Sequence, residues 1–210
     1  MEVVTFNTLN KIQREQAAQI LTEEVPEGWP TFADAAEEIA ELISGSDYMF
    51  LGAVENSEII GWAGLLPQYG KVFELHPLVV RHDRQQRGIG SILLNEIMNA
   101  AREKGGLTLI LGSGDEKPEG ETSFANVDLY EDLPRKIAEY EPGTHATAFY
   151  LKHGFQVVGV TPDAYGIGKP DIHMSIRLYQ THIPAPGQDF FFPPRYNEPA
   201  NRKILTPGKR

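Results

Sequence analysis

The feature that most constrains the fold of this chain is an apolar run with a proline inside it, from Val72 to Val80. Proline has no amide hydrogen to donate to a neighbouring strand, so Pro77 predicts a bulge in a strand of a sheet. A bulge forces the neighbouring strand away, and the amide of Leu78 then points at something other than a partner strand. Pro77 is equally compatible with the end of a short edge strand, and the sequence leaves both interpretations open.

The loop Gln85 to Ser91 follows this strand and leads into a predicted amphipathic helix. The first amides of a helix have no acceptor within it, and the helix dipole places positive charge there, so this end suits phosphate oxygens. Gly88 and Gly90 remove side chains that would hold a phosphate away from the backbone. The pattern Q-x-x-G-x-G therefore predicts a diphosphate-binding loop, with Arg84 and Arg87 adding charge at its rim.

Composition narrows the class of protein. The 210 residues carry a net charge of -10, with a pI near 5.1. Nucleic acid is an improbable partner because a phosphate-binding surface needs a basic stripe, and a cationic substrate fits better. The absence of cysteine excludes a thiolate metal site and a thiol nucleophile, and no metal site is expected. No apolar run approaches the roughly 20 residues that cross a bilayer, so we expect a cytoplasmic protein without a membrane partner.

Hydrophobic periodicity predicts one α/β (α+β) domain over residues 1–178, followed by an extension over residues 179–210 that is rich in proline and phenylalanine. The predicted strands cover residues 3–6, 48–54, 59–66, 72–80, 107–111, 156–161 and 172–178. The predicted helices cover residues 8–23, 31–44, 89–104 and 144–153.

Negative charge is concentrated between Asp115 and Glu141, where nine carboxylates stand against three cations. A charge run of this kind is usually a solvated surface. This segment follows the strand over 107–111 and precedes the helix over 144–153, and the family resemblance described below implies that it lies on the acceptor side of a cleft. A carboxylate-lined cleft concentrates cationic amines.

Together, the bulged strand, the Q-x-x-G-x-G loop, the helix and the following strand resemble the acetyl-CoA-binding core of the GNAT superfamily of N-acetyltransferases. Further blocks resemble the chromosomal-type, dimeric aminoglycoside 6'-N-acetyltransferases: Pro67-Gln68-Tyr69-Gly70, Glu74-Leu75-His76-Pro77-Leu78-Val79-Val80, Asp128-Leu129-Tyr130-Glu131, Phe149-Tyr150 with Gly154-Phe155, Val157-Val158-Gly159-Val160 and Gly168-Lys169-Pro170-Asp171-Ile172. The resemblance implies a GNAT fold, a central mixed, mostly antiparallel sheet with a bulged strand splayed at the acetyl-CoA site and flanking helices. It also implies a homodimer.

Four residues are expected to be catalytic, and the resemblance implies the roles of Glu74 and Tyr150 among them. Glu74 faces the substrate amine as a partner or base, and His76 shares its face of the strand and relays a proton. Leu78 donates its backbone N–H to the thioester carbonyl, and the phenol of Tyr150 protonates the departing thiolate. The alternatives are an outward surface carboxylate for Glu74, a hydrogen-bonded structural histidine for His76 and a core aromatic for Tyr150.

Binding residues complete the expected site. For acetyl-CoA they are Leu78, Val80, Gln85, Gln86, Arg87, Gly88, Ile89, Gly90, Ser91 and Tyr150. For the small cationic amine we expect Glu74, with Asp115 binding a second amino group and Trp29 as a wall of the cleft.

The chain departs from this subgroup in two places. It has His145-Ala146-Thr147-Ala148-Phe149-Tyr150 where those enzymes tend to show His-Pro-Tyr-Glu-Phe-Tyr, and Tyr165 stands where a small polar residue is expected. These differences leave the acceptor open between an aminoglycoside, another polyamine and an amino sugar. Two alternatives to a small-molecule enzyme are a non-catalytic acyl-CoA-binding module and an enzyme that acetylates a protein amine.

Overall fold

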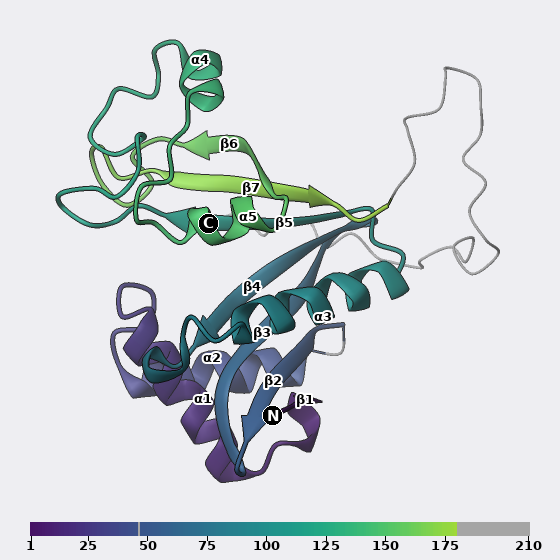
Figure 1. The fold of residues 1–210 in the computed structure, drawn as a ribbon. Helices are drawn as coiled ribbons and strands as arrows, with labels where there is room; N and C mark the ends of the chain where they lie inside the picture. Colours follow the sequence, from purple (N-terminus) through teal and green to yellow (C-terminus); the bar gives the residue numbers. More distant parts are fainter. Residues whose placement is uncertain (46, 180–210) are drawn as a thin grey trace, which may run out of the picture. The chain divides into compact units, whose positions relative to one another are not determined.

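Within residues 1–45 and 47–179, which the computed structural model describes, the strands form one seven-stranded sheet in the order β1-β2-β3-β4-β5-β7-β6 (Figure 1). The strands are β1 (Glu2–Thr5), β2 (Met49–Glu55), β3 (Glu58–Tyr69), β4 (Val72–Val80), β5 (Thr108–Gly114), β6 (Gln156–Thr161) and β7 (Asp171–Arg177). Neighbours are antiparallel except for β4 and β5, which are parallel. The predicted mixed, mostly antiparallel sheet is confirmed.

Helices flank both faces of this sheet. Their bounds are η1 (Phe6–Thr8), α1 (Lys11–Glu24), α2 (Phe32–Ser44), η2 (His82–Arg84), α3 (Ile89–Glu103), α4 (Leu133–Ala138) and α5 (Thr147–Lys152). The helices α1 and α2 lie behind the sheet in Figure 1, and α3 lies in front. No helix in the described part of the chain is long and apolar enough to cross a membrane.

Two hydrophobic clusters lie on opposite faces of the sheet, because successive side chains of a strand point to opposite sides. In β2, Phe50 packs with α1 and α2, whereas Leu51 packs in the cluster that contains the inner face of α3. Trp62 is completely buried, and its indole N–H donates to Ala17 O at 3.1 Å. This hydrogen bond joins β3 to α1 inside the first cluster.

The predicted bulge in β4 is present at His76 and Pro77. Ala63 of β3 pairs with Leu78, and Leu65 pairs with Leu75, so Gly64 alone opposes two residues of β4. A Cβ atom added at Gly64 would collide with the His76 carbonyl oxygen and with the Phe50 ring. Glycine at position 64 therefore lets the two backbones approach closely opposite the bulge.

Beside this bulge the sheet opens. Strand β5 pairs with β4 over three residue pairs, from Val72 with Thr108 to Glu74 with Ile110. Beyond Ile110, β5 continues only with β7 on its other side, as far as Gly114. Figure 1 shows β4 and β5 adjacent at one end and diverging toward the other. The half of β4 that contains the bulge thus has no partner strand on its β5 side.

Several predicted boundaries were wrong, for local reasons. The helix expected from Thr8 begins at Lys11, because the Asn10 side chain caps it in a capping box with Gln13. Strand β3 runs past Leu66 to Tyr69, and its pairing becomes irregular at Pro67. The short helix α4 was missed within the acidic segment. The predicted extension over 179–210 lies outside the described residues apart from its first residue.

Replacement of Gly64 by alanine is expected to lower the free energy of unfolding by about 2 kcal/mol, because the new methyl group overlaps the backbone of the bulge. Urea unfolding followed by circular dichroism measures this change. Gly70→Ala is the matched control, since no atom lies within 4 Å of a Cβ placed there, and it should change stability by less than about 0.5 kcal/mol. Equal stability of both variants would contradict close packing at the bulge.

Candidate active site

The loop before α3 presents backbone amides in the predicted way. Gly88 caps α3 in the left-handed conformation, with φ 83°, and Gln86 also has a positive φ of 57°. The first hydrogen bond of the helix runs from Ile92 N–H to Gly88 O at 3.0 Å. The amides of Ile89, Gly90 and Ser91 therefore have no acceptor within the helix, which makes this turn a site for an anion.

The side chain of Gln85 ties this loop to its surroundings. Its amide donates to Val80 O at 3.0 Å and to the Glu24 carboxylate at 2.7 Å. The loop is thus joined both to the end of β4 and to the end of α1. Arg84, expected as rim charge, lies 3.9 Å from carboxylate oxygens of Glu55 and Asp83. Its charge is shared with these two groups.

The amide of Leu78 points toward the opening between β4 and β5. Arg81 N–H donates to Ile60 O at 3.0 Å, which makes these residues a hydrogen-bonded pair of the β3–β4 ladder. Such pairs alternate with non-hydrogen-bonded pairs along an antiparallel ladder. By this alternation Val79 faces β3, and the amides of Leu78 and Val80 face the side from which β5 has diverged.

Tyr150 lies in α5 within a group of aromatic rings. Its ring makes edge contacts with Phe149, at 5.2 Å between centroids, and with Phe155, at 5.6 Å. Burial raises the pKa of the Tyr150 phenol above its ordinary value near 10. The phenol therefore keeps its proton at neutral pH and is able to donate it.

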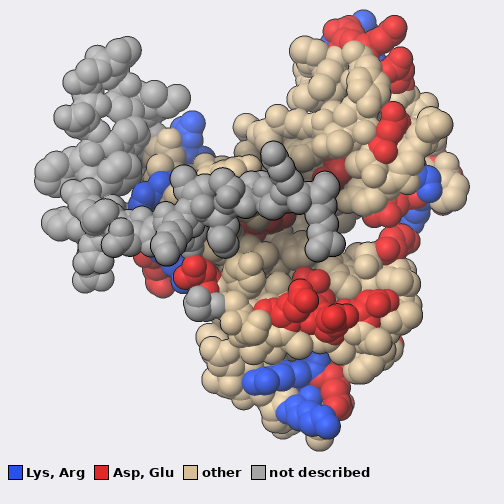
Figure 2. Space-filling view, turned by 180° about the vertical axis from the view of Figure 1, so that it is seen from behind, with Lys and Arg blue, Asp and Glu red and all other residues tan. Residues whose placement is uncertain are grey.

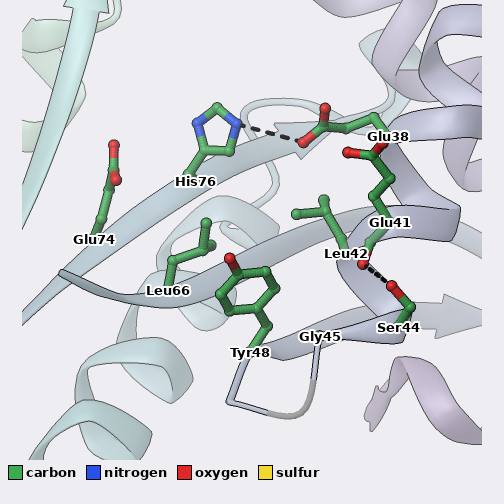
Figure 3. Close-up of a pocket in the computed structure, with 9 residues that line it drawn as sticks. All are labelled: Glu38, Glu41, Leu42, Ser44, Gly45, Tyr48, Leu66, Glu74 and His76. Atoms are coloured by element: carbon green, nitrogen blue, oxygen red, sulfur yellow. Dashed lines mark hydrogen bonds and ion pairs between the residues drawn. The ribbon is translucent and has the colours of Figure 1, made fainter. Parts of the chain in front are cut away.

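A pocket of about 600 Å³ opens beside β4 on the face covered by α1 and α2. Figure 3 shows its lining, to which β4 contributes Glu74 and His76 and α2 contributes Glu38 and Glu41. The remaining lining residues are Leu42, Ser44, Gly45, Tyr48 and Leu66. Three carboxylates thus surround one cavity, and Figure 2 shows acidic side chains gathered on this face of the molecule.

The predicted acceptor residues of β4 share this pocket. His76 Nε2 lies 3.9 Å from the Glu38 carboxylate, and its ring centroid lies 5.7 Å from that of Trp29. The Glu74 carboxylate accepts a hydrogen bond from the Gln68 side-chain amide. The structure therefore brings Glu74, His76 and Trp29 to one region, in spite of the shift of register at the bulge.

Sequence reasoning missed the two carboxylates of α2. In the sequence, Glu37, Glu38 and Glu41 are typical of the solvated face of an amphipathic helix. The buried positions of this helix are Ala35, Ile39 and Leu42. Which part of that face borders a cavity depends on how the helix sits against β4. The spacing of Glu38 and Glu41, one turn apart, is the signal that places both on the same side.

The structure gives Asp115 a different place from the predicted one. The residue is completely buried, and its carboxylate accepts backbone N–H groups of Glu121 and Thr122 at 2.8 to 3.1 Å. A carboxylate used in this way closes its own loop and is covered from solvent. Asp115 is not among the residues that line the pocket described above, and its role in binding a second amino group stays a prediction from the sequence.

Two other carboxylates of the acidic segment form ion pairs within the segment. Glu121 pairs with Lys117 at 2.9 Å, and Glu139 pairs with Arg135 at 2.9 Å. Burial and the nearby charge of Glu27 raise the pKa of the Glu116 carboxyl. This segment thus approaches the turn between α1 and α2 through Glu116, but none of its residues is among those that line the pocket.

Comparison with known proteins defines the family. The model of the acetyltransferase (GNAT) family matches residues 14–118. An aminoglycoside 6'-N-acetyltransferase solved with coenzyme A is 32% identical, with a TM-score of 0.80. The aminoglycoside 6'-N-acetyltransferase from Enterococcus faecium is 32% identical, with a TM-score of 0.78. Both alignments cover 87% of this chain and 100% of the solved one. The sequence has no match among functionally curated proteins.

The chain belongs to the GNAT acetyltransferase family. The predicted enzyme class, an N-acetyltransferase, and the predicted acyl donor, acetyl-CoA, are thereby confirmed. A solved aminoglycoside 6'-acetyltransferase of type Ii is similar as well, at 29% identity and a TM-score of 0.67. The described residues contain no group of three or more His, Asp or Glu side chains placed to hold a metal ion.

The residues of this GNAT chain fit the donor. The first amides of α3 offer hydrogen bonds to the diphosphate, and a Cβ at Gly88 would meet no atom within 4 Å, so the loop has room outside it. The opening between β4 and β5 would receive the pantetheine arm, beside the amides of Leu78 and Val80. Tyr150 is the partly buried phenol of α5, the helix that precedes β6.

Gly90→Ala is expected to weaken the binding of coenzyme A without lowering the stability of the protein. A Cβ at Gly90 would make ordinary contacts, 3.5 Å from the Phe149 ring, and alanine favours helix, so stability should stay equal or rise by about 0.5–1 kcal/mol. The methyl group crowds the diphosphate, and the loss of one charge-assisted hydrogen bond should raise the Kd about tenfold. Calorimetry and thermal unfolding measure both quantities, with Gly70→Ala as control. An unchanged Kd would contradict this position for the diphosphate.

Proposed function

We propose that this enzyme transfers the acetyl group of acetyl-CoA directly to a primary amine of a cationic small molecule, in a ternary complex. The observation that carries this proposal is the pocket in which Glu38, Glu41 and Glu74 surround one cavity beside the opening in the sheet. Carboxylates in a confined cavity attract ammonium groups and reject anions. The 6'-amino group of an aminoglycoside is the acceptor that the two similar enzymes at 32% identity support.

Each residue of the site has a role in this proposal. Glu74 holds the acceptor amine and takes up its proton, directly or through water, and His76 assists as a relay. The Leu78 amide donates a hydrogen bond to the carbonyl oxygen on which negative charge develops. Bound acetyl-CoA supplies an acetyl group already activated as a thioester. Tyr150 donates its phenolic proton to the leaving sulfur, and Trp29 bounds the acceptor beside His76.

The α2 carboxylates extend this proposal to the rest of the acceptor. Glu38 and Glu41 lie one helical turn apart and face β4 across the pocket (Figure 3). An acceptor with a second ammonium group can therefore engage α2 while its reactive amine lies at Glu74. We assign to this pair the role that the sequence had suggested for Asp115. A homodimer and a cytoplasmic location remain predictions from the sequence.

A thiol-release assay with acetyl-CoA and a panel of amines tests the acceptor. Neomycin and paromomycin form a matched pair, because the second carries a hydroxyl where the first has the 6'-amine. Thiol release with neomycin and none above background with paromomycin is the expected result. Release with spermidine alone would move the acceptor to linear polyamines, and coenzyme A binding without release for any amine would leave a non-catalytic binding module.

Charge removal on α2 tests the acceptor pocket. Glu38→Gln and Glu41→Gln are each expected to raise the KM for the amine about tenfold, because a partly buried ion pair is lost, and to leave the KM for acetyl-CoA unchanged. Glu37→Gln is the matched control, since Glu37 is exposed on the same helix and does not line the pocket. Equal effects of all three changes would indicate general attraction by the acidic face.

Tyr150→Phe tests the proton donor and its pH dependence. Loss of a positioned acid should lower kcat about 100-fold. Because burial raises the pKa of Tyr150, the phenol is protonated below that raised value, and its contribution is lost only as the pH rises through it. The ratio of wild-type to variant kcat should therefore stay constant from about pH 6 to about pH 9. A ratio that falls across this range would show that the phenol titrates there.

A further inference from the structure

A histidine lies at each end of α5, the helix that carries Tyr150. At the first end, His145 is buried, and its Nε2 lies 2.9 Å from Gly114 O at the end of β5. A carbonyl oxygen only accepts hydrogen bonds, so Nε2 carries the proton. This end of the helix is fixed to the strand that diverges from β4.

At the second end, His153 makes two hydrogen bonds of different kinds. Its Nδ1 lies 2.8 Å from Phe149 O, and its Nε2 lies 3.0 Å from Ser91 Oγ. When the ring is neutral, the Phe149 carbonyl fixes its proton on Nδ1, which leaves the lone pair of Nε2 as an acceptor. Ser91 therefore donates its hydroxyl hydrogen to His153. This side-chain hydrogen bond joins residues that are 62 positions apart in the sequence.

Ser91 belongs to the first turn of α3, where the amides have no acceptor within the helix. Further contacts between α3 and α5 lie close to this hydrogen bond. The Phe149 ring centroid is 4.3 Å from that of His153, and a Cβ at Gly90 would lie 3.5 Å from the Phe149 ring. The residues on either side of Tyr150 thus contact the diphosphate-binding turn, Phe149 by packing and His153 by a hydrogen bond.

We propose that His153 is a positioning residue, which acts through Ser91 to set the distance between the diphosphate-binding turn and Tyr150. This inference rests on the proposed function. The diphosphate and the thioester sulfur lie at opposite ends of the pantetheine arm, so an enzyme that grips both must hold α3 and α5 in fixed register. His153 is not among the residues that line the acceptor pocket, and its effect reaches the reaction through α5.

Two acyl donors separate this role from simple packing. Acetyl-CoA has the diphosphate, whereas S-acetylpantetheine has the same thioester and arm without it. His153→Phe keeps an aromatic ring beside Phe149 and removes the acceptor, and Ser91→Ala removes the donor. Each change is expected to lower kcat/KM with acetyl-CoA about tenfold and to leave kcat/KM with S-acetylpantetheine within about twofold, because no diphosphate is then held in register.

Further variants sharpen the test. The double variant should be no slower than either single one, because both changes break the same hydrogen bond. His153→Gln should recover part of the loss, since its amide oxygen can accept from Ser91. Thr161→Val is the matched control, because it removes the hydroxyl partner of a second histidine, His173, at 2.8 Å on β6 and β7. It should leave both donors unaffected.

The possible outcomes distinguish a failure of the role proposed for His153 from a failure of the proposed function. Equal losses with both donors would show that His153 only stabilises α5, and no loss with acetyl-CoA would show that the hydrogen bond is not used; either result would overturn the inference alone. A wild-type enzyme that releases no thiol from acetyl-CoA with any amine would remove the proposed function and this inference with it.

Discussion

The active site depends on a hydrogen bond that proline cannot make. Pro77 has no amide hydrogen, and the strand around it bulges opposite Gly64. The ladder between β4 and β5 ends just before this point, at Glu74 and Ile110. Backbone amides that would otherwise have paired with β5, those of Leu78 and Val80, are thereby available to a ligand. The same strand carries Glu74 and His76 into the acceptor pocket, so the donor and acceptor sides meet on one strand.

A protein of net charge -10 must bind a donor that is itself a polyanion. The structure meets this need with neutral groups, because the first turn of α3 presents amides that α3 itself leaves unsatisfied. The dipoles of these amides act over a short range and would stabilise a diphosphate bound at this turn. In the proposed function, the carboxylates of α2 and β4 lie on the acceptor side, where they attract a cationic amine. Backbone amides are thus assigned to the anionic donor, and carboxylate side chains are assigned to the cationic amine of the proposed acceptor.

Much of this arrangement could be predicted from the sequence, because it depends on local chemistry. The consequences of Pro77 and of the glycines in the loop follow from the residues themselves. The α2 carboxylates could not be found in this way, since only packing decides which part of a polar helix face borders a cavity. The burial of Asp115 could not be found for a related reason. A run of carboxylates does not reveal which of them folds back onto the amides of its own loop.

Hydrogen exchange of individual amides, with and without saturating acetyl-CoA, tests the central claim most directly. The amides of Leu78 and of the turn Ile89 to Ser91 should exchange at least about tenfold more slowly in the complex, because each gains an acceptor from the ligand. The amides of β2, which lie within the sheet, should be unchanged. Failure of acetyl-CoA to bind, or binding that leaves Leu78 and this turn exchanging as before, would contradict the account.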